Sequence, residues 1–174
     1  DSSCQYCCHQ SVTIEQKGKE HTYTPDSQEL QNDSLLLDGG TDGIAIPSIE
    51  RAQNPPVYYG TLEIKKTAQG LLIINELSLE AYLEAVVPSE MPASYEEQAL
   101  MAQAVCARTY AVCQIQENSL EKYGADVDDS VNYQVYNNFG ADKRTNKAVQ
   151  DTKGQILCQN GEPITAVSYT HLTL

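Results

Sequence analysis

At 174 residues and 19.1 kDa, the chain has the length of one domain, with or without a tail. It carries 24 Asp and Glu against 11 Lys and Arg, a net charge of −13, and no basic run that would suit a polyanion. Nucleic acid and anionic membrane surfaces are therefore not expected partners, whereas a neutral, cationic or sugar-like partner stays open. The longest apolar stretches fall far short of the roughly 20 residues of a membrane span, so no transmembrane segment is predicted.

Tyrosine supplies nearly all the aromatic bulk, with 11 copies against one Phe and no Trp. Tyrosines suit both half-buried strands and sugar-contacting grooves, and composition alone leaves both open. The chain does not begin with Met and shows no signal peptide, so we expect a mature or trimmed fragment.

The N-terminal stretch "CQYCCH" places Cys4, Cys7, Cys8 and His9 at C-x-x-C spacing. A structural zinc site needs a second ligand pair further along, and the next histidine, His21, has no cysteine nearby. An ordinary N-terminal segment is the favoured interpretation. No cofactor is predicted, and zinc is left open.

Residues 1–56 are polar and rich in turn signals, with short β-like pieces such as "SVTIEQ" and "GIAIP". From Val57 the pattern sharpens. "VYYGTLEIKK" and "GLLIINEL" predict two strands of a hairpin joined by "KTAQG".

Two helices are predicted next. In "SLEAYLEAVV" the residues Leu79, Tyr82, Leu83 and Val86 form an apolar helical stripe, and Pro88 is expected to end this helix. The capping box from Ser94 to Glu97 then predicts a second helix from about 95 to about 116.

The remaining elements are short. "VNYQVYNN" is strand-like, "TNKAVQDTKG" indicates a helix closed by Gly154, and Asn160-Gly161 predicts a hairpin turn. The predicted fold class is α+β, with mostly antiparallel strands and hairpins flanking a two-helix motif.

Arg108 is the most unusual residue of the second predicted helix. On a helical wheel it falls within the apolar arc of Leu100, Ala104, Ala107, Ala111 and Ile115, while Gln103, Cys106 and Gln114 occupy the polar face. A buried arginine needs acceptors, so a paired, functional arginine is predicted. The alternative is an arginine that reaches solvent past small alanines.

Glu90 is expected between the two helices, held by Pro88 and Pro92. A carboxylate fixed in this way suits acid–base chemistry at a groove, although it equally suits a cap or salt bridge at the junction. Other catalytic patterns are absent: there is no G-x-S-x-G, phosphate loop or H-E-x-x-H. Cys106 and Cys113 are predicted to pack rather than react.

The stretch "YLEAVVPSEMPASYEEQALMAQAVCARTYA" (82–111) resembles the signature of the stage II sporulation protein D family, SpoIID. That signature reads Y-L-x-G-V-V-x-x-E-M-P and then E-A-L-K-A-Q-A-V-A-A-R-T-Y-A. The resemblance extends from "YYGTLEI" to "GEPITA" and covers roughly residues 57–167. Met101 replaces the usual Lys, and Ala85 the usual Gly.

The resemblance implies a lytic transglycosylase that cleaves MurNAc–GlcNAc bonds of stem-peptide-free peptidoglycan strands during engulfment in sporulation. It implies Glu90 as the general acid and base, protonated in a desolvated site. Arg108 is then expected to contact substrate or a backbone acceptor and to pair with Glu90 only transiently. Further candidates for substrate binding or orientation are Gln103, Gln134, Tyr136 and Tyr169.

Three segments are predicted: an N-terminal β-rich or irregular segment (1–56), a partial SpoIID-like core (57–167), and a tail that departs from the family (168–174). Because the distal groove wall is expected beyond this point, an inactive truncated fragment is one alternative. Another is a non-catalytic glycan-binding enhancer of a cell-wall amidase. The expected location is extracytoplasmic, at the cell wall or membrane of a spore-forming bacterium.

Overall fold

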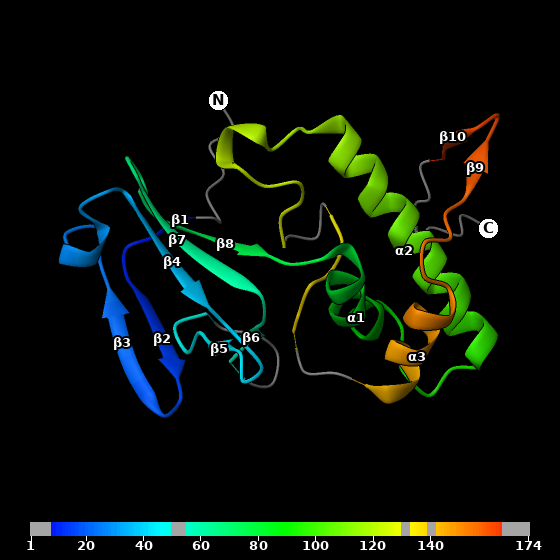
Figure 1. Cartoon of the computed structure of the whole chain (residues 1–174), viewed down its shortest axis with the longest axis horizontal. Helices are drawn as coiled ribbons and strands as arrows, with labels where there is room; N and C mark the ends of the chain where they lie inside the picture. Colours follow the sequence, from blue (N-terminus) through cyan, green and yellow to red (C-terminus); the bar gives the residue numbers. More distant parts are fainter. Residues whose placement is uncertain (1–7, 50–54, 130–132, 139–141, 165–174) are drawn as a thin grey trace, which may run out of the picture. The chain divides into compact units, whose positions relative to one another are not determined.

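The computed structural model describes residues 8–49, 55–129, 133–138 and 142–164 (Figure 1). It combines helices with antiparallel sheets, which confirms the predicted α+β class. The chain divides into two compact units, Asp1–Ser78 and Leu79–Leu174. Among the described residues, no helix is both long and apolar enough to cross a membrane.

The described residues of the first unit form two four-stranded antiparallel sheets. One has the order β1-β8-β7-β4, formed by Cys8–His9, Gly70–Glu76, Thr61–Thr67 and Ser34–Asp38. The other has the order β3-β2-β5-β6, formed by Lys19–Tyr23, Val12–Gln16, Ile44–Ala45 and Val57–Tyr58. A short 3₁₀ turn, η1, covers Gln28–Leu30.

The alternation of side chains along these strands builds the core of the first unit. The buried apolar residues of the unit are Val12, Ile14, Tyr23, Leu30, Ile44, Ile46, Tyr58, Leu62, Ile64, Leu71 and Leu72. The predicted hairpin is confirmed: β7 pairs with β8 from Thr61↔Glu76 to Thr67↔Gly70.

The boundary between the units differs from the predicted break after residue 56. Strand β7 pairs with β4, and β6 pairs with β5, so both belong to sheets begun by earlier strands. The hairpin that opens the SpoIID resemblance therefore lies in the first unit, and the second unit starts with a helix at Leu79.

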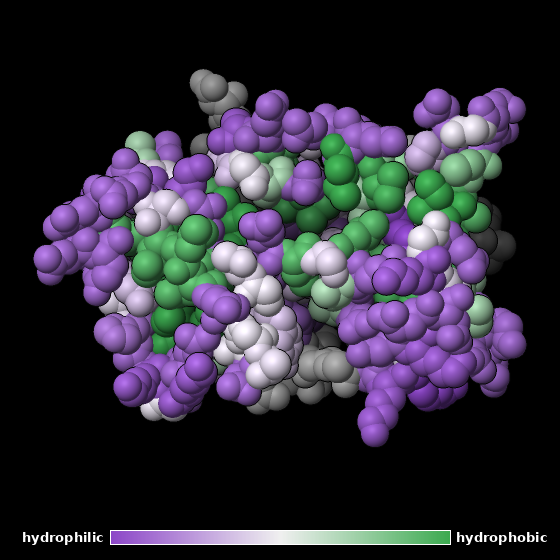
Figure 2. Space-filling view, viewed as in Figure 1, coloured by the Kyte–Doolittle hydropathy of each residue, from purple (hydrophilic) through white to green (hydrophobic). Residues whose placement is uncertain are grey.

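The described part of the second unit consists of three helices and a small hairpin. Helices α1 (Leu79–Glu90), α2 (Glu97–Glu117) and α3 (Lys143–Asp151) pack on one another, and a 3₁₀ turn, η2, covers Glu121–Tyr123. Their contact surfaces are largely small and aliphatic: Leu83, Val86, Val87, Leu100, Ala104, Ala107, Ala111, Ala148 and Val149. The outer face of α3 is hydrophilic (Figure 2).

The helix boundaries correct two predictions. Pro88 lies inside α1, which continues to Glu90, so Glu90 is the last helical residue rather than part of a linker. Proline in a last turn removes only one intrahelical hydrogen bond, and the helix tolerates that loss. Helix α2 begins later than predicted: its N-cap is Glu96, and no side-chain cap hydrogen bond forms there.

Of the predictions for the chain after α2, some are confirmed and one is wrong. The α3 N-cap, Asp142, accepts hydrogen bonds from the backbone N–H groups of Arg144 and Thr145 at 2.8 and 3.3 Å. The hairpin at Asn160-Gly161 is confirmed by strands β9 (Cys158–Gln159) and β10 (Glu162–Pro163). In contrast, the described part of the predicted strand, residues 133–138, belongs to no sheet.

Candidate functional site

Glu90 lies on the surface of the second unit, at the C-terminal end of α1. Its Oε1 accepts a hydrogen bond from the backbone N–H of Val135 at 2.8 Å. Within the described part of the chain, no hydrogen bond is seen to its Oε2. The carboxylate is thus oriented by one oxygen and presents the other, but it is exposed and not in the desolvated setting that we predicted.

The segment 133–138 is fastened to the end of α1 by two side chains. Besides Glu90, Ser89 contributes its hydroxyl, which accepts from the Asn137 N–H at 3.2 Å and donates to the Ala85 carbonyl at 2.7 Å. The Val135 and Asn137 N–H groups therefore bind helix side chains and are not available to a neighbouring strand.

Gln134 and Tyr136 fill the space behind this segment. Gln134 is buried, and its side-chain amide donates to the Ala107 carbonyl at 3.3 Å. Tyr136 is also buried and stacks on Tyr82, with ring centroids 5.3 Å apart. Both candidates therefore gather near Glu90. Their burial favours orientation of the Val135 backbone over direct contact with a substrate.

Tyr82 was placed in the apolar stripe by its spacing, but its polar role was not foreseen. Its hydroxyl donates to the Gln134 side-chain oxygen at 3.4 Å. Burial, followed by the nearby Tyr136, raises the pKa of Tyr82, so its hydroxyl remains a donor at neutral pH. The Glu90 and Asp128 carboxylates contribute to the same rise, so Asp128 is a second acid within electrostatic reach of Tyr82.

Arg108, a residue of α2, contacts the first turn of α1 and does not pair with Glu90 at its last turn. It is 1% exposed and forms a bidentate ion pair with Glu80, with Nε–Oε1 and Nη2–Oε2 distances of 2.9 and 2.8 Å. Its remaining N–H groups meet the Val149 and Gln155 carbonyls, each at 3.1 Å, and the Thr152 hydroxyl at 3.5 Å. The expected backbone acceptors are present, but all three nitrogens are engaged inside the protein.

The partner of Arg108, Glu80, was missed from sequence. Ten residues separate Glu80 from Glu90, which corresponds to about 15 Å along a helix. A usable signal existed: Glu80 precedes the buried Leu83 by three positions and the buried Val87 by seven, so it lies on the inner face of α1. Hydrogen bonds from Arg108 hold the pKa of Glu80 below its usual value of 4.5, against the opposing effect of burial.

The other predicted site residues do not join the Glu90 cluster. Gln103 is half-buried on α2, and Tyr169 lies outside the described residues. Cys4 and Cys7 also lie outside them, whereas Cys8 lies in β1 with its Sγ 3.6 Å from the Thr67 hydroxyl. In the described ranges, no three His, Cys, Asp or Glu side chains gather as a metal site, and zinc at the N-terminus remains untested.

The two cysteines of α2 have different surroundings. Cys113 is buried, and its thiol donates to the Ile164 carbonyl at 3.5 Å. Burial raises the pKa of the Cys113 thiol, which disfavours the reactive thiolate. Cys106 is half-buried. The packing role predicted for Cys113 agrees with this geometry.

Comparison with known proteins identifies the family. The model of the stage II sporulation protein family, SpoIID, matches residues 67–158, which is more than half of the chain. An amidase enhancer of Bacillus subtilis is 41% identical over 166 residues, covering 79% of this chain and 22% of the relative. The stage II sporulation protein D of the same organism is 37% identical over 107 residues, covering 53% and 31%.

An uncharacterized protein of Brachyspira hyodysenteriae is also 37% identical, over 126 residues, covering 71% of this chain and 32% of the relative. The chain thus spans between about a fifth and a third of the length of these relatives. No solved structure matches it. On the extent of the family match, the chain belongs to the SpoIID family.

Proposed function

We propose that the chain acts on peptidoglycan as a lytic transglycosylase, with Glu90 as the single acid and base, in an extracytoplasmic step of sporulation. The observation that carries the proposal is that, within the described residues, Glu90 is held through only one of its two carboxylate oxygens. Val135 N–H binds Oε1, and Ser89 fastens the adjoining backbone, so Oε2 is presented in a defined direction. A pre-oriented carboxylate on a rigid helix end suits proton transfer.

In the proposed reaction, the protonated Glu90 carboxyl donates its proton to the glycosidic oxygen between MurNAc and GlcNAc, and the C1–O bond breaks. The carboxylate then accepts the proton of the muramic C6 hydroxyl as that oxygen bonds to C1. The products are a 1,6-anhydro-muramic end and a free GlcNAc hydroxyl, and Glu90 returns to its protonated form. No second carboxylate takes part, unlike in most glycosidases.

The Glu90 side chain is exposed in the free protein. A bound glycan strand would cover Glu90 and exclude water from it, and burial favours the neutral form of a carboxyl group. Arg108 supports the same site indirectly: its contacts fix the first turn of α1 and so position the helix whose last residue is Glu90.

The test is incubation with denuded glycan strands, followed by mass spectrometry for anhydro-muramic ends. Glu90→Gln is expected to reduce product formation by about 100-fold or more, the usual size of a general acid–base contribution. Equal yields from wild type and Glu90→Gln would show that Glu90 is not the catalyst. Asp128→Asn tests the single-acid mechanism: an equally large loss would indicate a two-carboxylate reaction instead.

A second candidate function is a glycan-binding enhancer of a cell-wall amidase. It is favoured by the similarity to the Bacillus subtilis amidase enhancer and by the exposure of Glu90 in the free protein. This function needs the glycan surface but not proton transfer. Glycan binding and amidase stimulation that both survive Glu90→Gln, with no anhydro-muramic product from wild type, would support it over catalysis.

A further inference from the structure

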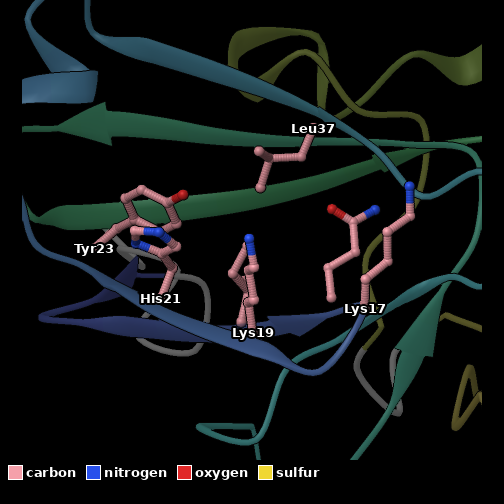
Figure 3. A pocket seen from close by; sticks show the side chains of 7 residues that line it. Lys17, Lys19, His21, Tyr23 and Leu37 are labelled. Carbon is pink, nitrogen blue, oxygen red and sulfur yellow. The ribbon is translucent and has the colours of Figure 1, made fainter.

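A hollow of about 260 Å³ lies in the first unit, whereas Glu90 belongs to the second. The hairpin of β2 and β3 supplies most of its lining, and Leu37 of β4 faces that hairpin (Figure 3). Drug-sized pockets measure roughly 300–1,000 Å³, so this hollow suits one small ring with its substituents.

Register and alternation sort the charges of this hairpin onto two faces. Lys19 pairs with Gln16, His21 with Ile14, and Tyr23 with Val12, so these side chains share one face. Glu20 pairs with Glu15 and Thr22 with Thr13, which places the acids on the opposite face. In a chain of net charge −13, the face toward the hollow is therefore locally basic.

Two lysines give this hollow its charge. Lys17 lies in the Lys17-Gly18 turn and Lys19 follows it, and both line the hollow with exposed side chains. Across the described residues, neither ammonium group forms an ion pair. The nearby Asp38 accepts from the Gly40 N–H at 2.8 Å through Oδ1, and none of the described ion pairs joins it to either lysine.

One end of the hollow offers a flat aromatic surface. His21 and Tyr23 stack with their centroids 5.9 Å apart and their planes 17° from parallel, and Lys19 lies between this pair and Lys17 (Figure 3). Burial raises the pKa of Tyr23, so its hydroxyl stays protonated. Gln16 donates to the Asp38 carbonyl at 2.6 Å and thereby keeps its side-chain oxygen fixed at the rim.

From this arrangement we infer that the hollow binds a sugar ring that carries a carboxylate. The aromatic pair and Leu37 provide the surface against which the apolar face of a sugar packs, and the two ammonium groups provide the charge that a carboxylate requires. The expectation that such a saccharide comes from the cell wall rests on the proposed function. The anionic-sugar chemistry rests only on the residues of the first unit.

The test is titration of the full chain, followed by two-dimensional NMR, with N-acetylmuramic acid, N-acetylglucosamine and lactate. The first sugar differs from the second only by its lactyl carboxylate, and lactate lacks the ring. N-acetylmuramic acid is expected to shift the amide signals of residues 16–23 and to bind more tightly than either fragment. The inference is wrong if N-acetylglucosamine or lactate binds as tightly as N-acetylmuramic acid. It is also wrong if N-acetylmuramic acid shifts none of these signals.

The charge contribution is tested with Lys17→Asn/Lys19→Gln. Asparagine tolerates the positive φ of 52° at position 17. No hydrogen bond is seen from either lysine side chain to a described residue, so the fold should persist. The double variant is expected to weaken N-acetylmuramic acid binding by about 5- to 30-fold and leave N-acetylglucosamine binding unchanged.

Lys143→Gln, an exposed lysine on α3, is the control for net charge and should bind like wild type. Equal affinities of the double variant and wild type for N-acetylmuramic acid would overturn the inference. None of these readouts depends on glycan cleavage, so a failure here is distinct from a failure of the role proposed for Glu90.

Discussion

Helix α1 carries a glutamate at each end, and the two differ in burial and in hydrogen bonding. At the first turn, Glu80 is largely buried, and both of its carboxylate oxygens are bound by the Nε–Nη2 edge of the Arg108 guanidinium. At the last residue, Glu90 is exposed and bound by one backbone N–H. A fully paired carboxylate has no capacity left for chemistry, whereas a singly held one has. The comparison favours a stabilising role for the Glu80 end of α1, and it leaves the Glu90 end free for the chemistry that we propose there.

The largest effect is expected from breaking the buried end. Arg108→Met should destabilise the second unit by about 3–5 kcal/mol, because Glu80 would keep its charge without its partner. Urea unfolding followed by circular dichroism at 222 nm reports on this unit, since α1, α2 and α3 all belong to it. Arg144→Met is the matched control: Arg144 is exposed, and its guanidinium donates to the Tyr95 carbonyl at 2.7 Å.

A second variant separates a lost ion pair from poor packing. Arg108→Met combined with Glu80→Leu removes both charges and should recover much of the lost stability. If the double variant is as unstable as Arg108→Met alone, the unpaired Glu80 charge is not the cause.

A smaller effect is expected from pH. Because the pKa of Glu80 is lowered in the folded state, its ion pair stabilises the fold above about pH 4.5 and loses this contribution as the pH falls through the folded-state value. Wild type should therefore exceed Glu80→Gln in urea midpoint at pH 7, and the gap should narrow at pH 3. Glu84→Gln is the control, since Glu84 binds the neutral amides of Asn146 and Gln150. An unchanged gap between pH 7 and pH 3 would contradict the assignment.

The smallest effects are expected at the Glu90 end. Ser89→Ala should cost about 1 kcal/mol, because it removes the acceptor of the Asn137 N–H. Faster hydrogen exchange at Asn137 would check this. Glu90→Gln keeps a side-chain oxygen for the Val135 N–H and should change stability by less than about 0.5 kcal/mol. A larger loss from Glu90→Gln would mean that Glu90 is also a structural residue.

The sequence predicted those features that depend on local chemistry. Periodicity located α1 and α2, and Asn160-Gly161 marked its hairpin because both residues adopt positive φ, 54° and 87°. The wheel placed Arg108 among buried alanines, where it is found. It also placed Ile115 there, yet Ile115 is 44% exposed near the C-terminal end of α2.

The features that sequence reasoning missed depend on contacts between distant segments. Pro88 was expected to end α1, but the docking of residues 135 and 137 onto Ser89 and Glu90 occurs on a helix that continues past it. The partner of Arg108 lies 28 residues away on another helix, and a wheel drawn for one helix carries no information about a second. Pro88 and Pro92 predicted a linker at Glu90 because a local proline pattern does not report the contacts that distant residues make with the helix end.

The hydrogen-bond acceptors of Arg108 also affect when the second unit can fold. They come from the first turn of α1, from α3 and from the Gln155 carbonyl, which lies 47 residues after the arginine. During synthesis, Arg108 has no complete set of acceptors until residue 155 has left the ribosome. The second unit should therefore fold in one late step, and chains that stop before this point should remain open to proteases along α1 and α2.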